Sequence, residues 1–226
     1  MTYLSNTSIQ LLALSFVVFN SCQNTVEQSQ NANTSPDTLI QTAVSKETGS
    51  SVYQVVKGEV RWIGKKALGS SHQGTIQVEA GELVISNSNL VSGKITIDMN
   101  SLAVTDIQDA GERRDLESHL KDADFFEVEK FPKAEFVFDQ VVTGGNNPNF
   151  NAIASGQLTM KGKVNRVNIP VKLDIDQASL KAESASFLID RTKWGVNFRS
   201  SALHTVKDKL IEDNVILTFS LEAKKQ

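Results

Sequence analysis

From Val52 onward, apolar and polar residues alternate along the chain with a period of two. This period is typical of β-strands that bury one face, because successive side chains of a strand point to opposite sides. Ile95, Ile97 and Met99, for example, alternate with charged or hydroxyl-bearing residues. The pattern covers the segments 53–66, 76–80, 95–99, 134–138, 156–160, 167–175, 187–189 and 215–221. It predicts about eight strands, each with one apolar face.

Short polar or glycine-bearing segments separate these strands and favour antiparallel neighbours. They lie around Gly81, at 86–89, at 143–149 and around Gly162. Pro170 interrupts a regular strand and cannot donate to a ladder, so we expect a bulge or an edge there. One helix is predicted, in the segment 111–126, where Leu116 and Leu120 are four residues apart.

Antiparallel strands with one apolar face can close into a barrel or pack as a two-sheet sandwich. Periodicity alone does not choose between them. In a sandwich, the apolar residues would fill the core. A barrel of about eight strands is wide enough to be filled by side chains or to hold one small ligand.

The N-terminal segment carries an apolar run, Ile9–Phe19, that is too short to span a bilayer but has the length of a secretory h-region. The following "NSCQN" resembles the lipobox of bacterial lipoproteins. We therefore expect residues 1–22 to be a lipoprotein-type signal peptide with lipidation at Cys22, which would anchor the chain to a membrane. A plain signal peptide, or a cytosolic chain with an apolar N-terminus, is the alternative. Residues 23–50 are polar and predict a flexible tether, which leaves 51–226 for the barrel domain.

Charge and motifs exclude several classes of function. The net charge of −3 and the absence of a basic stripe argue against a nucleic-acid partner. No G-x-S-x-G, P-loop, G-x-G-x-x-G or Cys/His dyad occurs, so we expect no enzyme and no cofactor. His119 lies among acidic residues but lacks a known metal-ligand spacing, and we expect it to bond locally rather than to bind a metal.

Five stretches in order carry a family resemblance: "WIGKK", "SGKITIDMNSLAVTD", "LESHLKDADFFEVEKFPKAEFVF", "GQLTMKGKVNRVNIPV" and "FLIDRTKWGVNF". The block "HLKDADFFEVEKFPKAEF" is the most specific of them. Together they span almost all of residues 52–223, and the chain is identified as a member of the YceI family of bacterial secreted proteins.

The resemblance implies an all-β fold, an eight-stranded antiparallel lipocalin-like barrel that encloses an isoprenoid chain, such as a polyprenyl phosphate or a quinone tail. The implied function is non-enzymatic binding or shuttling of this amphiphile in the bacterial envelope, in the periplasm or on a membrane anchor. The alternative is a structural or protein-interaction module with a filled barrel and no ligand. The sequence leaves the formation of homo-oligomers open.

Candidate ligand-binding residues follow from the inward parity of the strands and from the Phe125–Phe126 pair after the predicted helix. We expect at least one ring of this pair at the cavity, whereas the alternative makes both rings core residues. Arg191, in a family-typical element with Asp190, is expected to form a structural ion pair. The strand candidates are Trp62, Ile97, Phe136, Phe138, Leu158, Leu173, Phe187 and Phe219.

Overall fold

The computed structural model describes residues 49–144, 147–201 and 210–226. The predictions for the signal peptide 1–22, for Cys22 and for nearly all of the tether 23–50 lie outside these residues. Among the helices of these three ranges, none has the length and apolar character needed to cross a membrane.

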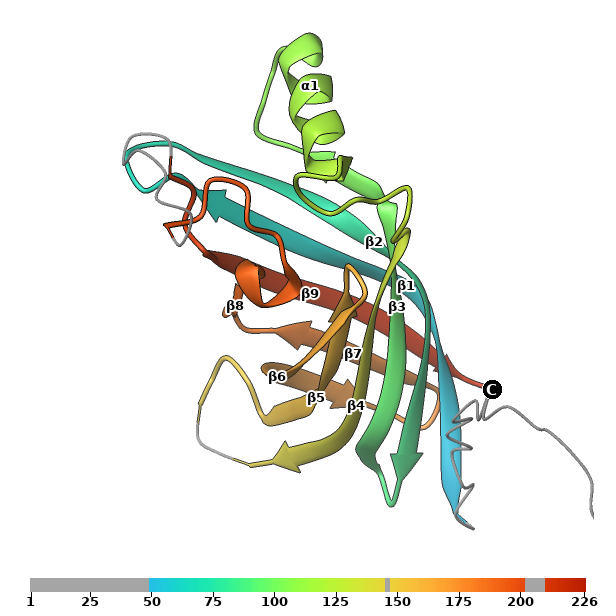
Figure 1. The fold of residues 1–226 in the computed structure, drawn as a ribbon. Helices are drawn as coiled ribbons and strands as arrows, with labels where there is room; N and C mark the ends of the chain where they lie inside the picture. The colour runs from blue at the N-terminus through green and yellow to red at the C-terminus, as the bar shows by residue number, and fades with distance from the viewer. Residues whose placement is uncertain (1–48, 145–146, 202–209) are drawn as a thin grey trace, which may run out of the picture. The chain divides into compact units, whose positions relative to one another are not determined.

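The described residues form strands for most of their length, joined mainly by short turns (Figure 1). One α-helix interrupts the strands, and one short 3₁₀ helix precedes the last strand. The elements are β1 (Ser50–Lys65), β2 (Ser71–Ser86), β3 (Asn89–Val104), α1 (Ala110–Lys121), β4 (Lys133–Thr143), β5 (Ala152–Met160), β6 (Lys163–Ile175), β7 (Ser179–Ser184), β8 (Phe187–Asp190), η1 (Arg191–Trp194) and β9 (Asn214–Lys225).

Pairing of the first strand with the last closes the sheet. Strands β1 to β7 pair with their neighbours in chain order, β7 pairs with β9, and β9 pairs with β1 from Tyr53↔Lys225 to Ile63↔Ile216. All pairings are antiparallel. Strands β7 and β8 pair with successive parts of β9, so together they fill one position in the ring. The predicted eight-stranded antiparallel barrel is confirmed, and the sandwich is excluded.

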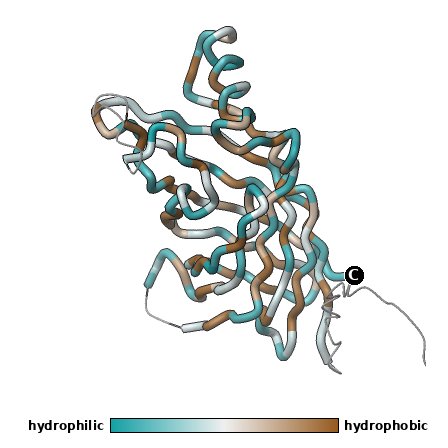
Figure 2. The backbone as a smooth tube through the Cα atoms, in the orientation of Figure 1, coloured by the Kyte–Doolittle hydropathy of each residue, from teal (hydrophilic) through white to brown (hydrophobic). Residues whose placement is uncertain are grey.

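Strand β4 shows how the sequence alternation becomes a barrel wall. Phe136 and Phe138 are buried, whereas Val137 between them is 46% exposed on the outer surface. Apolar and polar residues also alternate along other parts of the sheet (Figure 2). Because one face of every strand points inward, the apolar residues of the whole sheet share one interior.

Helix α1 lies at one end of the barrel, in the connection between β3 and β4 (Figure 1). The Asp109 carboxylate caps its first turn by accepting hydrogen bonds from the N–H groups of Gly111 and Glu112. The bonds from Glu112 and Gly111 hold the pKa of Asp109 below its usual value. The predicted helix is therefore present, although it ends at Lys121 and leaves the two phenylalanines in the turn that follows.

Two details of the sequence prediction were wrong, and the first is that β7 covers residues 179–184, for which no strand was expected. Gly81 makes no turn but lies inside β2, where a β-carbon would come within 2.6 Å of Val55 Cγ2, so it serves close packing. At Pro170 the β5–β6 register continues without a bulge. The β6–β7 register begins at Val171, so the proline lies where that ladder starts and is tolerated as an edge position, as expected.

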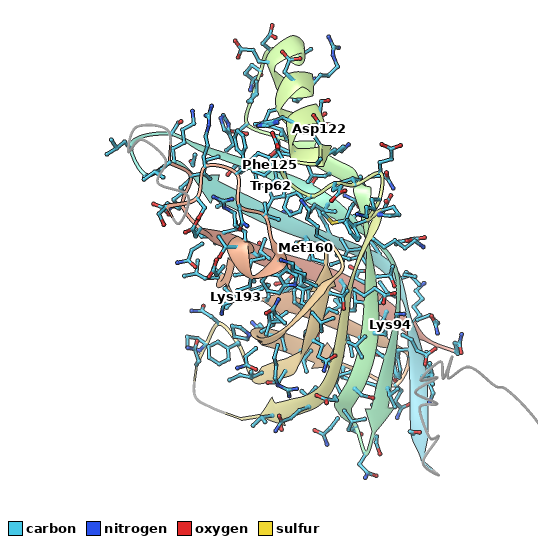
Figure 3. The ribbon with its side chains drawn as sticks, viewed as in Figure 1. Trp62, Lys94, Asp122, Phe125, Met160 and Lys193 are labelled. Atoms are coloured by element: carbon cyan, nitrogen blue, oxygen red, sulfur yellow. The ribbon has the colours of Figure 1, made fainter. Side chains whose placement is uncertain are left out.

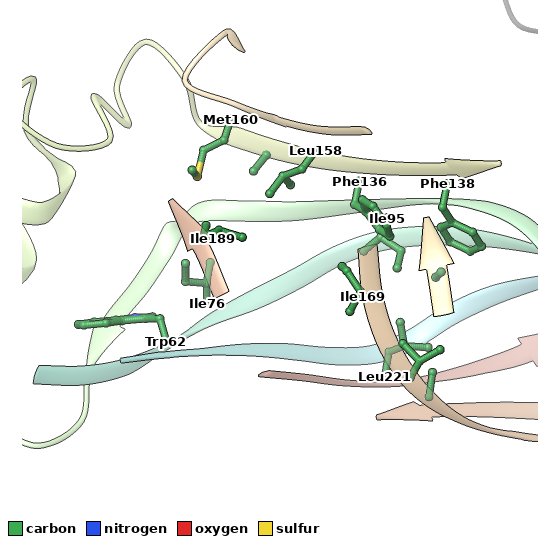
Figure 4. Close-up of a cluster of buried hydrophobic side chains, with 14 of the residues drawn as sticks. Trp62, Ile76, Ile95, Phe136, Phe138, Leu158, Met160, Ile169, Ile189 and Leu221 are labelled. Atoms are coloured by element: carbon green, nitrogen blue, oxygen red, sulfur yellow. The ribbon is translucent and has the colours of Figure 1, made fainter. Parts of the chain in front are cut away.

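The interior has two halves along the barrel (Figure 4). In the packed half, the rings of Phe136 and Phe138 stack with centroids 5.6 Å apart. At Gly156, opposite Phe138, a β-carbon would lie 2.4 Å from the Phe138 Cα, so glycine allows the two strands to approach. Ile95, Ile169 and Leu221 complete this half. The other half, nearer α1, contains a cavity.

Candidate ligand-binding cavity

A cavity of about 310 Å³ occupies the hollow half of the barrel, between α1 and the strands. Figure 3 shows Trp62 and Phe125 near α1 and Met160 further in. The lining is almost entirely apolar, with side chains from most of the strands, from α1 and from the turn after it. The apolar lining residues are Val60, Trp62, Ile76, Ile97, Met99, Leu102, Leu116, Leu120, Phe125, Phe126, Ala134, Leu158, Met160, Ile189, Val196, Ile211, Val215 and Leu217.

Several inward residues of this half are only partly buried because they face the cavity rather than another side chain. Val60, Ile97 and Leu217 have the inward parity of their strands, yet each is intermediate in exposure. Inward residues of the packed half, such as Phe138 at 3%, have lost nearly all their exposure. The cavity is therefore a region where apolar surface is left without a partner.

The ten residues predicted to bind a ligand divide between the two halves. Trp62, Ile97, Phe125, Phe126 and Leu158 line the cavity. Phe136 and Phe138 lie in the packed half, and Leu173, Phe187 and Phe219 pack against the core without lining the cavity. The structure thus brings five of them together around one space, and contact of any of the ten with a ligand stays a prediction.

The two tryptophans differ in their hydrogen bonding. Trp194 of η1 is 1% exposed, and its Nε1–H donates to the Leu158 carbonyl at 2.9 Å, which ties η1 to β5. Trp62 packs against Gly74, where a β-carbon would lie 2.6 Å from the indole ring. The buried Nε1–H of Trp62 has no hydrogen-bond partner among the described residues.

Aromatic rings form the side of the cavity next to α1. The His119 imidazole contacts Phe125 and Phe198 edge to face, with centroid distances of 5.0 and 4.7 Å. The local hydrogen bond expected for His119 is not found among the described residues, and ring packing holds it instead. Both rings of the Phe125–Phe126 pair line the cavity, and Phe125 also packs beneath the helix. No group of three potential metal ligands occurs in the described part of the chain.

Arg191 lines the cavity but is fully engaged in holding the chain around it. Its guanidinium donates to the carbonyls of Val196 at 2.6 Å, Ile211 at 3.0 Å and Glu212 at 3.1 Å. It also pairs with Asp213 at 3.4 Å, whereas Asp190 caps η1 through the N–H of Thr192. Burial lowers the pKa of Arg191, and the charges of Asp213 and Asp190 oppose this shift. Arg191 therefore forms the expected structural ion pair.

Four other basic residues line the cavity and were not predicted from the sequence: Lys65, Lys66, His72 and Arg199. Lys65, Lys66 and Arg199 are exposed, which places them at the mouth. The signal that could have found Lys66 is strand parity, since Trp62, Gly64 and Lys66 are two residues apart and all line the cavity.

A closed antiparallel barrel with an apolar cavity at one end belongs to the lipocalin-like class of folds. A family model described as "YceI-like domain" matches residues 47–223. The chain belongs to this family.

Comparison with solved structures supports the fold. Burkholderia cenocepacia BcnA is 20% identical, with a TM-score of 0.56 over 73% of this chain and 95% of that chain. A polyisoprenoid binding domain from Saccharophagus degradans, implicated in plant cell wall breakdown, is 14% identical, with a TM-score of 0.53 over 77% of this chain and 98% of that chain. A search of curated proteins gave no match. At these identities the likeness shows the barrel architecture.

Proposed function

We propose that the barrel binds an isoprenoid-type amphiphile, a polyprenyl lipid or a quinone, and carries it without chemical change. The observation that carries this proposal is the cavity of about 310 Å³ with its almost wholly apolar lining. Membership of the YceI family supports it, as does the structural likeness to a domain that binds polyisoprenoids. Each Å² of apolar surface covered by the ligand contributes about 25 cal/mol, so many weak contacts suffice for binding.

The lining supports binding rather than catalysis. Ser70 and His72 both lie at the mouth, but among the described residues they form no hydrogen bond with each other, and His72 instead contacts Asp106 at 3.0 Å. A nucleophile needs a base within hydrogen-bond reach. The described part of the lining therefore offers no activated serine, and we propose a carrier rather than an enzyme.

The size of the cavity indicates how much of an isoprenoid it encloses. A cavity of about 150 Å³ holds benzene, so about 310 Å³ corresponds to about a dozen carbon atoms. Two to three isoprene units would fill this space, by rough proportion. A longer tail would extend through the mouth or require the packed half around Phe136 and Phe138 to open.

The alternative is a structural or protein-interaction module whose barrel is filled. The packed half would suit that function, because its side chains fill the interior as in an ordinary core. The hollow half does not, because a cavity forfeits packing contacts that a purely structural barrel would gain from larger side chains. Native mass spectrometry of protein purified without detergent separates the two: a bound lipid mass supports the carrier, and an empty barrel that takes up no polyprenyl ligand supports the module.

Residues 1–22 support a place in the bacterial envelope, which remains a proposal from the sequence. The apolar run before Cys22 fits a secretory signal, and a lone thiol directly after it fits a lipid anchor. Expression with a labelled fatty acid should label the mature chain, and a Cys22→Ser variant should lose the label. Equal labelling of both chains would exclude the anchor at this residue.

Filling the cavity should block binding. Ile97 on β3 lines the cavity, so Ile97→Trp should weaken binding of farnesol about tenfold or more. The larger side chain displaces at least two carbons of the ligand, and burial of each contributes about 0.8 kcal/mol to the binding free energy. Val91 on the same strand is exposed, so Val91→Trp adds the same ring outside and should leave the affinity unchanged. Calorimetric titration of both variants provides the measurement. Equal affinities for the Ile97→Trp and wild-type chains would remove the cavity from the proposal.

The length of the isoprenoid ligand offers a second measurement. Affinity should rise from geraniol to farnesol and change by less than about threefold from farnesol to geranylgeraniol, since the hollow half is full after about a dozen carbons. Phe136 lies between Leu158, which lines the cavity, and Phe138 of the packed half (Figure 4). Phe136→Ala should lengthen the cavity, so the affinity of this variant should rise from farnesol to geranylgeraniol. A steady rise in the wild-type chain would show instead that the packed half opens for the ligand.

A further inference from the structure

The ionisable residues that line the cavity are all basic, within the described part of the chain. They are Lys65, Lys66, His72, His119, Arg191 and Arg199, and no aspartate or glutamate lies among them. The whole chain has the opposite balance, with 26 acidic residues against 23 lysines and arginines. The sign of the charge at the cavity therefore differs from that of the molecule as a whole.

Three of the six basic side chains are engaged with the protein itself. Arg191 donates to three carbonyls and pairs with Asp213. His72 lies 3.0 Å from the Asp106 carboxylate. The His119 ring is held between Phe125 and Phe198. These groups shape the cavity and are not available to a ligand's charge.

The other three, Lys65, Lys66 and Arg199, form no ion pair with any carboxylate of the described residues. All three are exposed, and the Arg199 guanidinium lies over the Phe198 ring at 5.0 Å. Contact with the ring orients the guanidinium, and its N–H groups donate to no acceptor among the described residues. The mouth therefore presents positive charge without a protein counter-charge in the described region.

Backbone geometry brings two of these residues to the same point. Lys66 continues the inward series of Trp62 and Gly64 beyond the end of β1, and it forms an antiparallel bridge with Ile211. The Ile211 N–H donates to the Arg199 carbonyl at 3.0 Å. Lys66 and Arg199 thus flank Ile211, which itself lines the cavity. A polar group at this point would lie where the apolar lining ends.

We propose that the cavity selects amphiphiles with an anionic head group, a phosphate or a carboxylate, which Lys66 and Arg199 hold at the mouth. The inference rests on the proposed function, since it requires the apolar tail to occupy the cavity. Charge-assisted hydrogen bonds from lysine and arginine to such oxygens are stronger than neutral ones, and the arginine fork fits both kinds of head. A neutral alcohol or quinone head would leave these charges without a partner.

The test compares three ligands with the same tail: farnesol, farnesoic acid and farnesyl phosphate, by calorimetric titration with the full chain. Both acids should bind about tenfold more tightly than the alcohol or better, because a hydrogen bond to a charged group contributes more than a neutral one. This preference should shrink as salt is raised, because the mouth is exposed. A larger gain for the phosphate or for the carboxylate identifies which head the site fits.

The double variant Lys66→Gln/Arg199→Gln should lose the preference for the acids while keeping the affinity for farnesol. Its control, Lys57→Gln/Lys172→Gln, removes the same charge at two exposed strand positions that do not line the cavity, and it should keep the preference. Equal binding of acids and alcohol by the wild-type chain would overturn the anionic head group while leaving the carrier intact. Absence of binding by all three ligands would overturn the proposed function itself. The wild-type comparison stands even if the double variant fails to fold.

Discussion

Closure of the sheet by β1 and β9 is the constraint on which the rest of the structure depends. A closed antiparallel barrel gives every strand one face toward a common interior. The volume of that interior is set by the number of strands rather than by the side chains that fill it. Whether the barrel is a core or a container therefore depends on the size and position of the inward residues.

In this barrel, one end of the interior is a packed core and the other end is a container. Stacked phenylalanines from β4 fill the end away from α1, whereas the end beneath α1 combines medium-sized apolar side chains with a cavity of about 310 Å³. The packed half supplies burial for stability, which a fully hollow barrel of this size would lack. Arg191 and Trp194 anchor the segments around the hollow half by hydrogen bonds to backbone carbonyls. Support and binding thus occupy different parts of one interior.

The period-two pattern was sufficient to predict every strand except β7, and Leu116 and Leu120 were sufficient to predict the helix. Periodicity reports the face of a strand, but not the depth of a residue along the barrel axis, which depends on register and tilt. For this reason Phe138 and Leu158 had the same prediction, although only Leu158 lines the cavity. Glycine at position 81 was ambiguous because turns and close strand packing both favour it. Parity alone gives Lys66 the inward side of its strand, but its position at the mouth of the cavity depends on its pairing with Ile211.

Xenon binding in crystals tests the central claim most directly, because xenon enters apolar cavities whatever the natural ligand is. Crystals of lipid-stripped protein under xenon pressure should show the gas between Trp62, Ile97 and Leu158, with none between Phe136 and Phe138. Xenon confined to the packed half, or absent from the space beneath α1, would contradict a barrel that is hollow at its helix end.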